Sequence, residues 1–214
     1  MKIRLAGDAM VIVEFEQRID PVINQRAIKL GDRLRARALP GVRDVVPGYC
    51  SVGVHFDPLR TDLAGLEQAI EREGREDESP AEPKLARVHD IPVTYGGVGG
   101  PDLISAAAMA DCTPAELIER HAARTYRVYM LGFVPGFAYL GRVDQTIAVP
   151  RHRVPRERVP AGSVGIAGEQ TGVYPIESPG GWQLIGRTST LMFDPLRDPA
   201  SLLAAGEGVR FVPR

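Results

Sequence analysis

A short segment in the second half of the sequence combines positive charge with a stiff backbone. Pro150–Pro160 reads PRHRVPRERVP, so arginines, a histidine and a single glutamate alternate with prolines. Proline fixes φ, so neighbouring side chains are held at a smaller loss of conformational entropy. Guanidinium groups held in this way suit bidentate capture of a carboxylate or phosphate. On composition alone, a solvated basic loop explains the segment slightly better than an anion-binding site. The choice between the two interpretations depends on the neighbouring loops.

Two glycine-bounded loops follow and favour a ligand site. Gly168–Gly172 (GEQTG) places a carboxylate, an amide and a hydroxyl between glycines that let the backbone approach a ligand. Glu169 could act as an acid or base if it is partly buried, and Gln170 could donate to an amide or carboxyl oxygen. Ser178–Trp182 (SPGGW) offers backbone N–H groups beside the only tryptophan. Hairpin turns alone would also explain the glycines, so the chemistry indicates an anion-binding pocket and no more.

Other signatures of catalysis or metal binding are absent from the sequence. The cluster Gly96–Gly100 has neither the lysine of a phosphate-binding P-loop nor the full G-x-G-x-x-G pattern. Ser163 stands outside any G-x-S-x-G motif, and we interpret it as a turn residue before a strand. Cys50 and Cys112 are far apart and match no zinc spacing, so buried free thiols are expected. No metal site is predicted.

The histidines show no pair at the spacing of metal ligands. His55 falls in a predicted strand and is interpreted as structural. His121 ends a predicted helix, where a cation would complement the helix dipole. His152 belongs to the basic segment and is the histidine that could bind a ligand.

The elements that must position these residues form two predicted domains. In the first, Asp20-Pro21 is a helix-start signal. Residues 74–83 (GREDESPAEP) are acidic and carry no large apolar side chain, which is typical of a linker, so we place the domains at 1–80 and 84–214. The first domain is predicted to be a ferredoxin-like α/β layer. Its expected strands are Met10–Glu16, Val42–Val46, Tyr49–Phe56 and a closing strand at Arg87–Val93, with a second helix around Leu63–Ile70.

The second domain is predicted to be a β-barrel preceded by two helices, so that the fold class is α+β. Thr113 and Glu116 form a capping box with Pro114 at the first helical position. Short β-rich runs separated by glycine and proline then indicate a closed or nearly closed barrel. The expected helices are Pro101–Ala110 and Thr113–Ala123, and the expected strands include Tyr126–Leu131, Ser163–Ala167, Trp182–Ile185 and Thr190–Phe193.

Composition excludes several classes of partner. A formal net charge of −1 provides no field that would attract nucleic acid or an anionic membrane. No apolar run approaches the roughly 20 residues that span a bilayer, and the first residues lack the apolar run of a signal peptide. A cytoplasmic protein is expected.

Three long motifs carry a resemblance to a known family. Met130–Gly141 (MLGFVPGFAYLG), Pro160–Pro175 (PAGSVGIAGEQTGVYP) and Ser178–Thr188 (SPGGWQLIGRT) closely resemble the 5-oxoprolinase B subunits, a family also called KipI or allophanate hydrolase subunit 1. Val45–Tyr49 (VVPGY) resembles the N-terminal domain of that family, so the likeness covers nearly the whole chain. The resemblance implies a ferredoxin-like domain followed by a cyclophilin-like β-barrel, together related to the carboxyltransferase region of urea carboxylase.

The resemblance also implies an activity and partners. A KipA-type sister subunit (the 5-oxoprolinase C subunit) and a third 5-oxoprolinase subunit would complete an enzyme that uses ATP to open 5-oxo-L-proline to L-glutamate. Phosphorylation of the lactam oxygen would supply a better leaving group, and an arginine-rich pocket would stabilise the charge that develops. The expected catalytic residues are Glu169, Gln170 and Arg156, and the expected substrate-binding residues are Arg151, His152, Arg158, Thr171, Trp182 and Arg187.

One loop departs from the family pattern. Tyr95-Gly96-Gly97 is followed by Val98-Gly99, where the family has a glutamate and an aromatic residue. This change leaves the exact substrate open. Two alternatives therefore stand beside the amidolyase: a KipI-like regulator that inhibits a sensor histidine kinase, and a urea- or allophanate-type carboxyltransferase subunit, which would need a separate biotin carrier.

Overall fold

The computed structural model describes residues 1–75 and 83–214, which belong to two compact units, Met1–Lys84 and Leu85–Arg214. Most of the predicted linker, residues 76–82, lies outside the described residues. Each unit has its own hydrophobic core, as expected of separate domains. The mixed α/β character and the closed barrel predicted from the sequence are both confirmed.

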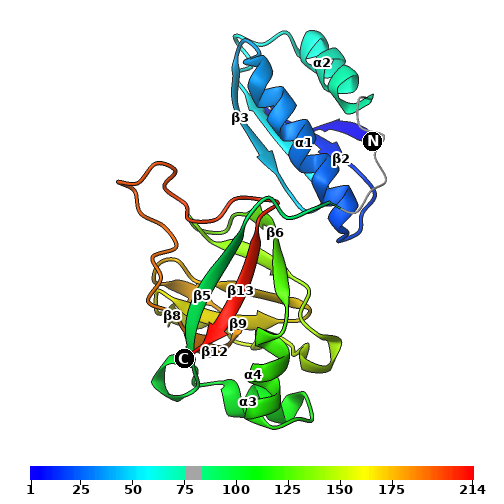
Figure 1. The fold of residues 1–214 in the computed structure, drawn as a ribbon. Helices are drawn as coiled ribbons and strands as arrows, with labels where there is room; N and C mark the ends of the chain where they lie inside the picture. Colours follow the sequence, from blue (N-terminus) through cyan, green and yellow to red (C-terminus); the bar gives the residue numbers. More distant parts are fainter. Residues whose placement is uncertain (76–82) are drawn as a thin grey trace. The chain divides into compact units, whose positions relative to one another are not determined.

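Unit 1 is a four-stranded antiparallel sheet with two helices, and its strand order is β1-β2-β4-β3. Figure 1 shows α1 lying across the sheet. The side chains of α1 that face the sheet, among them Ala27, Leu30 and Leu34, are buried with the inward residues of β2 and β4. The elements are β1 (Lys2–Leu5), β2 (Met10–Glu14), α1 (Pro21–Arg37), β3 (Val42–Pro47), β4 (Ser51–Phe56) and α2 (Leu63–Arg75).

The start of α1 follows the sequence signal. The Asp20 carboxylate accepts hydrogen bonds from the backbone N–H groups of Val22 and Ile23, and Pro21 occupies the first turn. Proline is tolerated there because its missing N–H would have no partner inside the helix. The predicted helix boundary is therefore confirmed.

The predicted closing strand of unit 1 is wrong. Residues 88–95 belong to the barrel of unit 2, and β1 pairs with β2 at the edge of the sheet instead. The alternation of apolar residues identified a strand at Arg87–Val93 correctly. It could not identify the sheet, because a strand's pairing partner depends on residues far away in the sequence.

Unit 2 is a closed seven-stranded barrel with the strand order β10-β7-β6-β13-β5-β12-β9. A separate two-stranded sheet, β8 with β11, accompanies it. The strands are β5 (Val88–Tyr95), β6 (Thr125–Leu131), β7 (Ala138–Gly141), β8 (Arg156–Val159), β9 (Ser163–Ala167), β10 (Gln170–Val173), β11 (Ser178–Gly180), β12 (Gln183–Arg187) and β13 (Gly208–Pro213).

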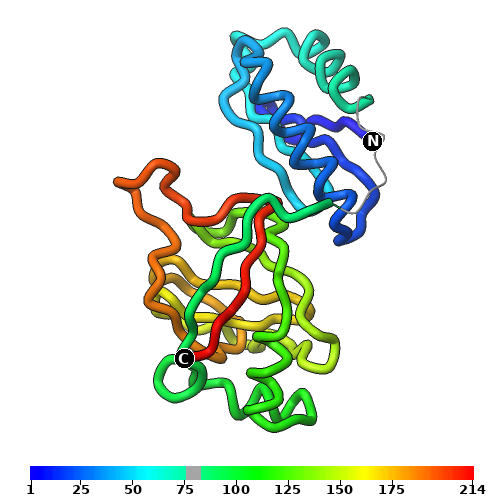
Figure 2. The backbone as a smooth tube through the Cα atoms, viewed as in Figure 1, coloured from blue at the N-terminus to red at the C-terminus, as the bar shows by residue number. Residues whose placement is uncertain are grey.

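The first and last strands of the barrel pair with each other. β5 and β13 run parallel over six residue pairs, from Val88 with Gly208 to Val93 with Pro213. Figure 2 shows the two segments, green and red, side by side. The other strand pairs in the barrel are antiparallel. The parallel pair joins the first strand of the barrel to the last and thereby closes the cylinder.

Short helices lie at one end of the barrel: α3 (Leu103–Met109) and α4 (Pro114–Ala122), with the 3-10 turns η1 (Gly97–Gly99) and η2 (Gln145–Ile147). The α4 capping box forms as predicted, since Thr113 and Glu116 bind each other's backbone N–H groups. The predicted strand Thr190–Phe193 does not form. Only an isolated bridge from Phe193 to Ser201 is present there.

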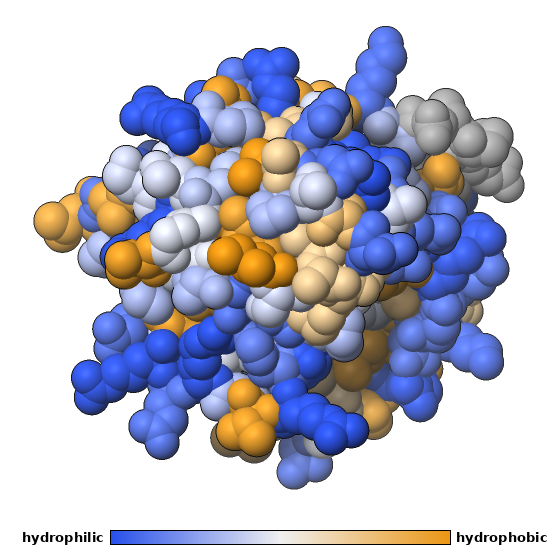
Figure 3. Space-filling view, turned by 90° about the horizontal axis from the view of Figure 1, so that it is seen from below, coloured by the Kyte–Doolittle hydropathy of each residue, from blue (hydrophilic) through white to orange (hydrophobic). Residues whose placement is uncertain are grey.

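Figure 3 views the molecule from the side on which α3 and α4 lie in Figure 1, and most of that surface is hydrophilic with separate apolar patches. In η1 and α3, the exposed apolar side chains include Val98, Ile104 and Met109. Among the described residues, no helix has both the length and the apolar character needed to cross a bilayer.

Candidate functional site

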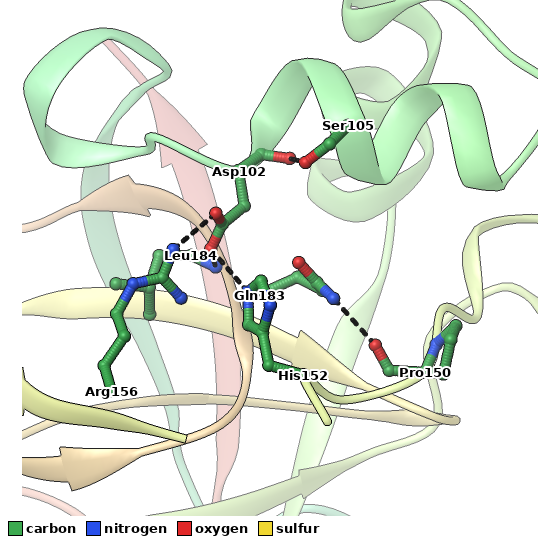
Figure 4. A network of polar contacts seen from close by, with 7 residues as sticks. All are labelled: Asp102, Ser105, Pro150, His152, Arg156, Gln183 and Leu184. Atoms are coloured by element: carbon green, nitrogen blue, oxygen red, sulfur yellow. Dashed lines mark hydrogen bonds and ion pairs between the residues drawn. The ribbon is translucent and has the colours of Figure 1, made fainter. Parts of the chain in front are cut away.

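Asp102 is the centre of a charged network on the barrel (Figure 4). It immediately precedes α3, and its side chain leaves that helix uncapped and turns toward β12. One carboxylate oxygen accepts the backbone N–H of Leu184 at 2.7 Å, while the Asp102 N–H donates to the Leu184 carbonyl at 2.9 Å. This reciprocal pair fixes the start of α3 against the strand.

Two side chains of the predicted basic segment bind the same carboxylate. Arg156 donates from Nη2 to Oδ1 at 2.6 Å, and His152 Nε2 lies 3.3 Å from Oδ2. The Asp102 side chain is 8% exposed. Burial alone would raise the pKa of Asp102, but the hydrogen bonds from Leu184, Arg156 and His152 outweigh it and hold that pKa below its ordinary value. Asp102 is therefore ionised at neutral pH.

The ionised carboxylate determines the tautomer of His152. A carboxylate only accepts hydrogen bonds, so Nε2 must carry the ring proton. In the neutral ring, Nδ1 is then the basic nitrogen. The backbone N–H of His152 donates to the carbonyl of Gly181 at 2.7 Å, which anchors the residue beside β12. The arrangement is that of an oriented general base, with about a third of the His152 side chain exposed.

Three buried polar atoms near this network have no hydrogen-bond partner among the described residues: Nη1 of Arg156, Oε1 of Gln183 and Oγ of Ser178. Gln183 is held by its other amide atom, since Nε2 donates to the Pro150 carbonyl at 2.9 Å, and Figure 4 shows it beside His152. Ser178 lies on β11, which pairs with the strand that begins at Arg156. Arg156 and Ser178 thus have a donor, and Gln183 an acceptor, that the described residues leave unpaired.

Aromatic side chains pack beside these polar groups. Phe137, Tyr139, Tyr174 and Trp182 meet edge to face, with centroids between 4.9 and 6.4 Å apart. Trp182 lies over the strands at Gly165 and Gly172, where an added Cβ would meet it at 3.1 and 3.2 Å. A side chain at either glycine would therefore press against Trp182.

The basic segment lies beside this aromatic cluster, since the His152 N–H donates to the carbonyl of Gly181, the neighbour of Trp182. Burial raises the pKa of Tyr174, while a hydrogen bond from the Trp182 backbone and the charges of Arg151 and Arg156 oppose the rise. Burial likewise raises the pKa of Tyr139, opposed by Arg151. Arg151, His152, Arg156 and Trp182, all predicted from the sequence, thus come together, and we call them with Asp102, Ser178 and Gln183 the Asp102 site.

The remaining predicted residues have other surroundings. Glu169 is exposed at the turn before β10, with Arg142 3.4 Å away. Gln170 begins β10, two residues before the glycine that lies under Trp182, so its side chain points to the same face of the sheet. Arg158 is exposed on β8. Arg187 lies at the end of β12, where its Nε donates to the Ala161 carbonyl at 3.0 Å.

Thr171 corrects the sequence-based expectation. Its side chain is fully buried inside the barrel, where Oγ1 donates to the Gly165 carbonyl at 2.9 Å and lies 2.8 Å from His121 Nε2. Because its hydroxyl proton is used on Gly165, it accepts the Nε2–H of His121. The β-strand alternation that exposes Gln170 turns Thr171 inward, away from a substrate.

His121 corrects a second expectation. It is completely buried, stacks on Phe211 with centroids 4.6 Å apart, and accepts the Tyr95 hydroxyl at Nδ1 over 2.7 Å. Burial lowers the pKa of His121 to about 3, so it is neutral and cannot act as a cation at the helix end. Tyr95, His121, Thr171 and Gly165 form one fully paired chain, which we call the inner network.

Sequence reasoning missed Asp102, Ser178 and Gln183. Asp102 follows Pro101 before an apolar helix, which is also the pattern of an ordinary helix start. The available signal was weak: a helix-start acid whose side chain is not used as a cap can be recognised only from the fold.

No group of three or more metal-binding side chains occurs within residues 1–75 and 83–214.

Comparison with known proteins assigns the family. The model of the carboxyltransferase domain, subdomains C and D, matches residues 1–203. The chain belongs to this family. The charged and aromatic groups of the Asp102 site all lie within the matched part of this carboxyltransferase-domain chain.

Two curated relatives cover nearly its whole length. The 5-oxoprolinase B subunit of Escherichia coli O157:H7 is 44% identical over 98% of this chain and 94% of that protein. The protein of the same name from Bacillus subtilis (strain 168) is 39% identical over 99% and 92%. Among solved structures, TTHA0988 superposes with a TM-score of 0.85 at 35% identity. The chain spans 40% of the length of that protein.

Proposed function

We propose that this chain is the B subunit of an ATP-dependent 5-oxoprolinase, which opens 5-oxo-L-proline to L-glutamate. The observation that carries the proposal is the near full-length identity to two proteins named as 5-oxoprolinase B subunits. The chain would act in a complex with a KipA-type sister subunit and a third subunit. Because ATP is consumed, the complex would work in the cytoplasm.

The Asp102 site supports a chemistry of this kind. His152, oriented by Asp102, has a basic nitrogen that would take a proton from the attacking water. Arg156 offers its second Nη group to the oxygen on which negative charge develops as the lactam opens. Gln183 and Ser178 would bind the polar edge of the amide, and Trp182 would exclude water from one side. Asp102 is a positioning residue for both His152 and Arg156.

The Gly96–Gly100 cluster does not fit a phosphate-binding loop for ATP. In the Gly96–Gly100 cluster, the N–H of Gly96 donates to the Ile185 carbonyl and that of Gly100 to the Gly96 carbonyl. A phosphate-binding loop needs such N–H groups free. We therefore propose that the ATP-binding groups come from another subunit.

The names of the two folds are part of this proposal. We interpret unit 1 as a rearranged ferredoxin-like layer, because β1 occupies the edge position that a strand after α2 would fill. The closed barrel with outer site residues suits a cyclophilin-like domain.

Reconstitution tests the function. The three subunits, purified together, are expected to convert 5-oxoproline to glutamate with ATP consumption. A complete assembly of folded subunits without turnover contradicts the proposal.

Two variants test the site within that assembly. His152→Gln removes the base, and Arg156→Lys replaces the two Nη donors of the guanidinium by one ammonium group. Each change is expected to lower kcat by about 100-fold or more. Arg210→Gln is the matched control, because Arg210 pairs with Asp90 on the surface. Normal turnover by both site variants would place the chemistry elsewhere.

A further inference from the structure

A second cleft of unit 2 gathers positive charge and hydroxyl groups away from the Asp102 site. It has a volume of ≈ 410 Å³. The residues that line it are Pro92, Thr94, Gly99, Arg187, Thr188, Ser189 and Arg214. None of these residues belongs to the Asp102 site, and none has an acidic side chain.

The barrel positions the two arginines of this cleft. Arg187 ends β12 and pairs with Thr94 of β5. Arg214 directly follows β13, and its backbone N–H donates to the carbonyl of Val93, also in β5. The Nε of Arg187 donates to the Ala161 carbonyl, which leaves both Nη groups of that guanidinium for a ligand. Neither arginine has an acidic partner in the part of the chain that the structure describes.

The hydroxyl groups have unused donors. The side-chain hydroxyls of Thr94 and Ser189 have no hydrogen-bond partner among the described residues. The Thr188 hydroxyl accepts from the Thr190 N–H at 3.0 Å, which leaves its own hydrogen unused by that bond. Gly99 also borders the cleft, and a side chain there would collide with Arg187, whose Cβ lies 2.9 Å from an added Cβ. Donors without acceptors are the requirement of an oxyanion.

We propose that this cleft binds a small oxyanion, a carboxylate or a phosphoryl group, through Arg187, Arg214 and the hydroxyls of Thr94 and Ser189. The protein carries a formal net charge of −1, so this cluster of unpaired positive charge is a local feature and not a general one. The proposal is independent of turnover at the Asp102 site.

Nuclear magnetic resonance of the full-length ¹⁵N-labelled chain tests the proposal. The chain is titrated separately with inorganic phosphate and with succinate, at constant ionic strength. Saturable shifts of the amides of Thr94, Arg187 and Ser189 support the site. Saturation by phosphate alone assigns a phosphoryl ligand, by succinate alone a carboxylate, and by both a general oxyanion site. Absence of saturable shifts at these amides with either anion overturns it.

Variants locate the binding. Arg187→Gln and Arg214→Gln are each expected to weaken the bound anion about tenfold or more, because each removes a charge-assisted donor. Arg187→Lys keeps the charge and should fall between. Arg87→Gln makes the same change just before β5, at the opposite end of the strand from Thr94, and should bind as the unmodified chain does. Affinities of both cleft variants equal to that of Arg87→Gln overturn the proposal, and Arg214→Gln decides alone if Arg187→Gln does not fold.

Discussion

The barrel contains two polar networks whose difference separates structure from function. In the inner network the hydrogens donated by Tyr95, His121 and Thr171 each have one acceptor. The groups are neutral, and His121 and Thr171 are buried while Tyr95 is partly buried. In the Asp102 site the groups are charged and partly exposed, and three buried atoms have no partner among the described residues. A completed network contributes to the fold, whereas the unpaired atoms of the outer network are the basis of the site proposed above.

Removal of the Asp102 carboxylate should give the largest change in stability. Asp102→Ala leaves Arg156 without its counter-ion and the Leu184 N–H without an acceptor, so we expect a loss of about 3–5 kcal/mol in the free energy of unfolding. Urea denaturation measures it. Asp90→Ala is the matched control, because Asp90 pairs with Arg210 on the surface, where solvent screens the pair, and its loss should be much smaller. Equal losses in the free energy of unfolding of the two variants would contradict the claim that the Asp102 carboxylate contributes more to stability than a surface carboxylate.

Acid should destabilise the inner network through His121. The pKa of His121 is about 3 in the folded chain, against an ordinary 6.5, so between these values the unfolded chain binds the additional proton. The contribution of the neutral ring is complete above pH 6.5 and is lost as the pH falls toward 3. We expect a loss on the order of a few kcal/mol.

The variant His121→Gln isolates this effect from other titrating groups such as Asp102. It should be less stable than the unmodified chain at pH 7, and the gap should shrink at pH 4. Urea denaturation at both values is the measurement. A constant gap would show that His121 does not titrate differently in the folded chain.

Thr171→Val should lower stability without harming chemistry. The variant keeps the shape of the side chain but leaves the His121 N–H without an acceptor, which costs about 1–3 kcal/mol. Because Thr171 faces the barrel interior, the turnover of a reconstituted complex, per folded chain, should stay unchanged. A large fall in kcat would indicate that Thr171 belongs to the substrate-binding site after all.

The smallest change in stability is expected for Ser178→Ala. Its Oγ has no partner among the described residues, so its removal should alter the free energy of unfolding by no more than about 0.5 kcal/mol. If it binds substrate, KM should rise in the complex. A stability loss as large as that of Thr171→Val would mean that Ser178 is part of the structural framework.

Local signals in the sequence predicted local structure well. Asp20-Pro21 and the Thr113–Glu116 box define helix starts through contacts within four residues, so the sequence contains all of the interaction. Arg151, His152 and Arg156 were found for a similar reason, since one stiff segment presents them. Thr190–Phe193 has β-branched character but pairs only at one bridge, because propensity does not supply a neighbouring strand.

Long-range contacts explain what could not be predicted. Asp102 becomes a site residue only when Arg156 and Leu184, 54 and 82 positions away, lie beside it. The neighbouring side chains of Gln170 and Thr171 point to opposite faces of β10. Which of them faces the barrel interior depends on the register of β10 with β9. His121 looked like a helix-end cation because its burial depends on Phe211, a residue of the last strand.

The pairing of β5 with β13 has a consequence for biosynthesis. Val88 must wait for Gly208, 120 residues later, before the cylinder can close. Unit 1 is a compact unit with its own hydrophobic core, so it can fold while the ribosome is still translating the barrel. Until the final strand emerges, β5 and β6 expose unpaired edges to other nascent chains. We expect a ribosome-bound chain stalled before residue 208 to show a protease-resistant unit 1 and a protease-sensitive remainder.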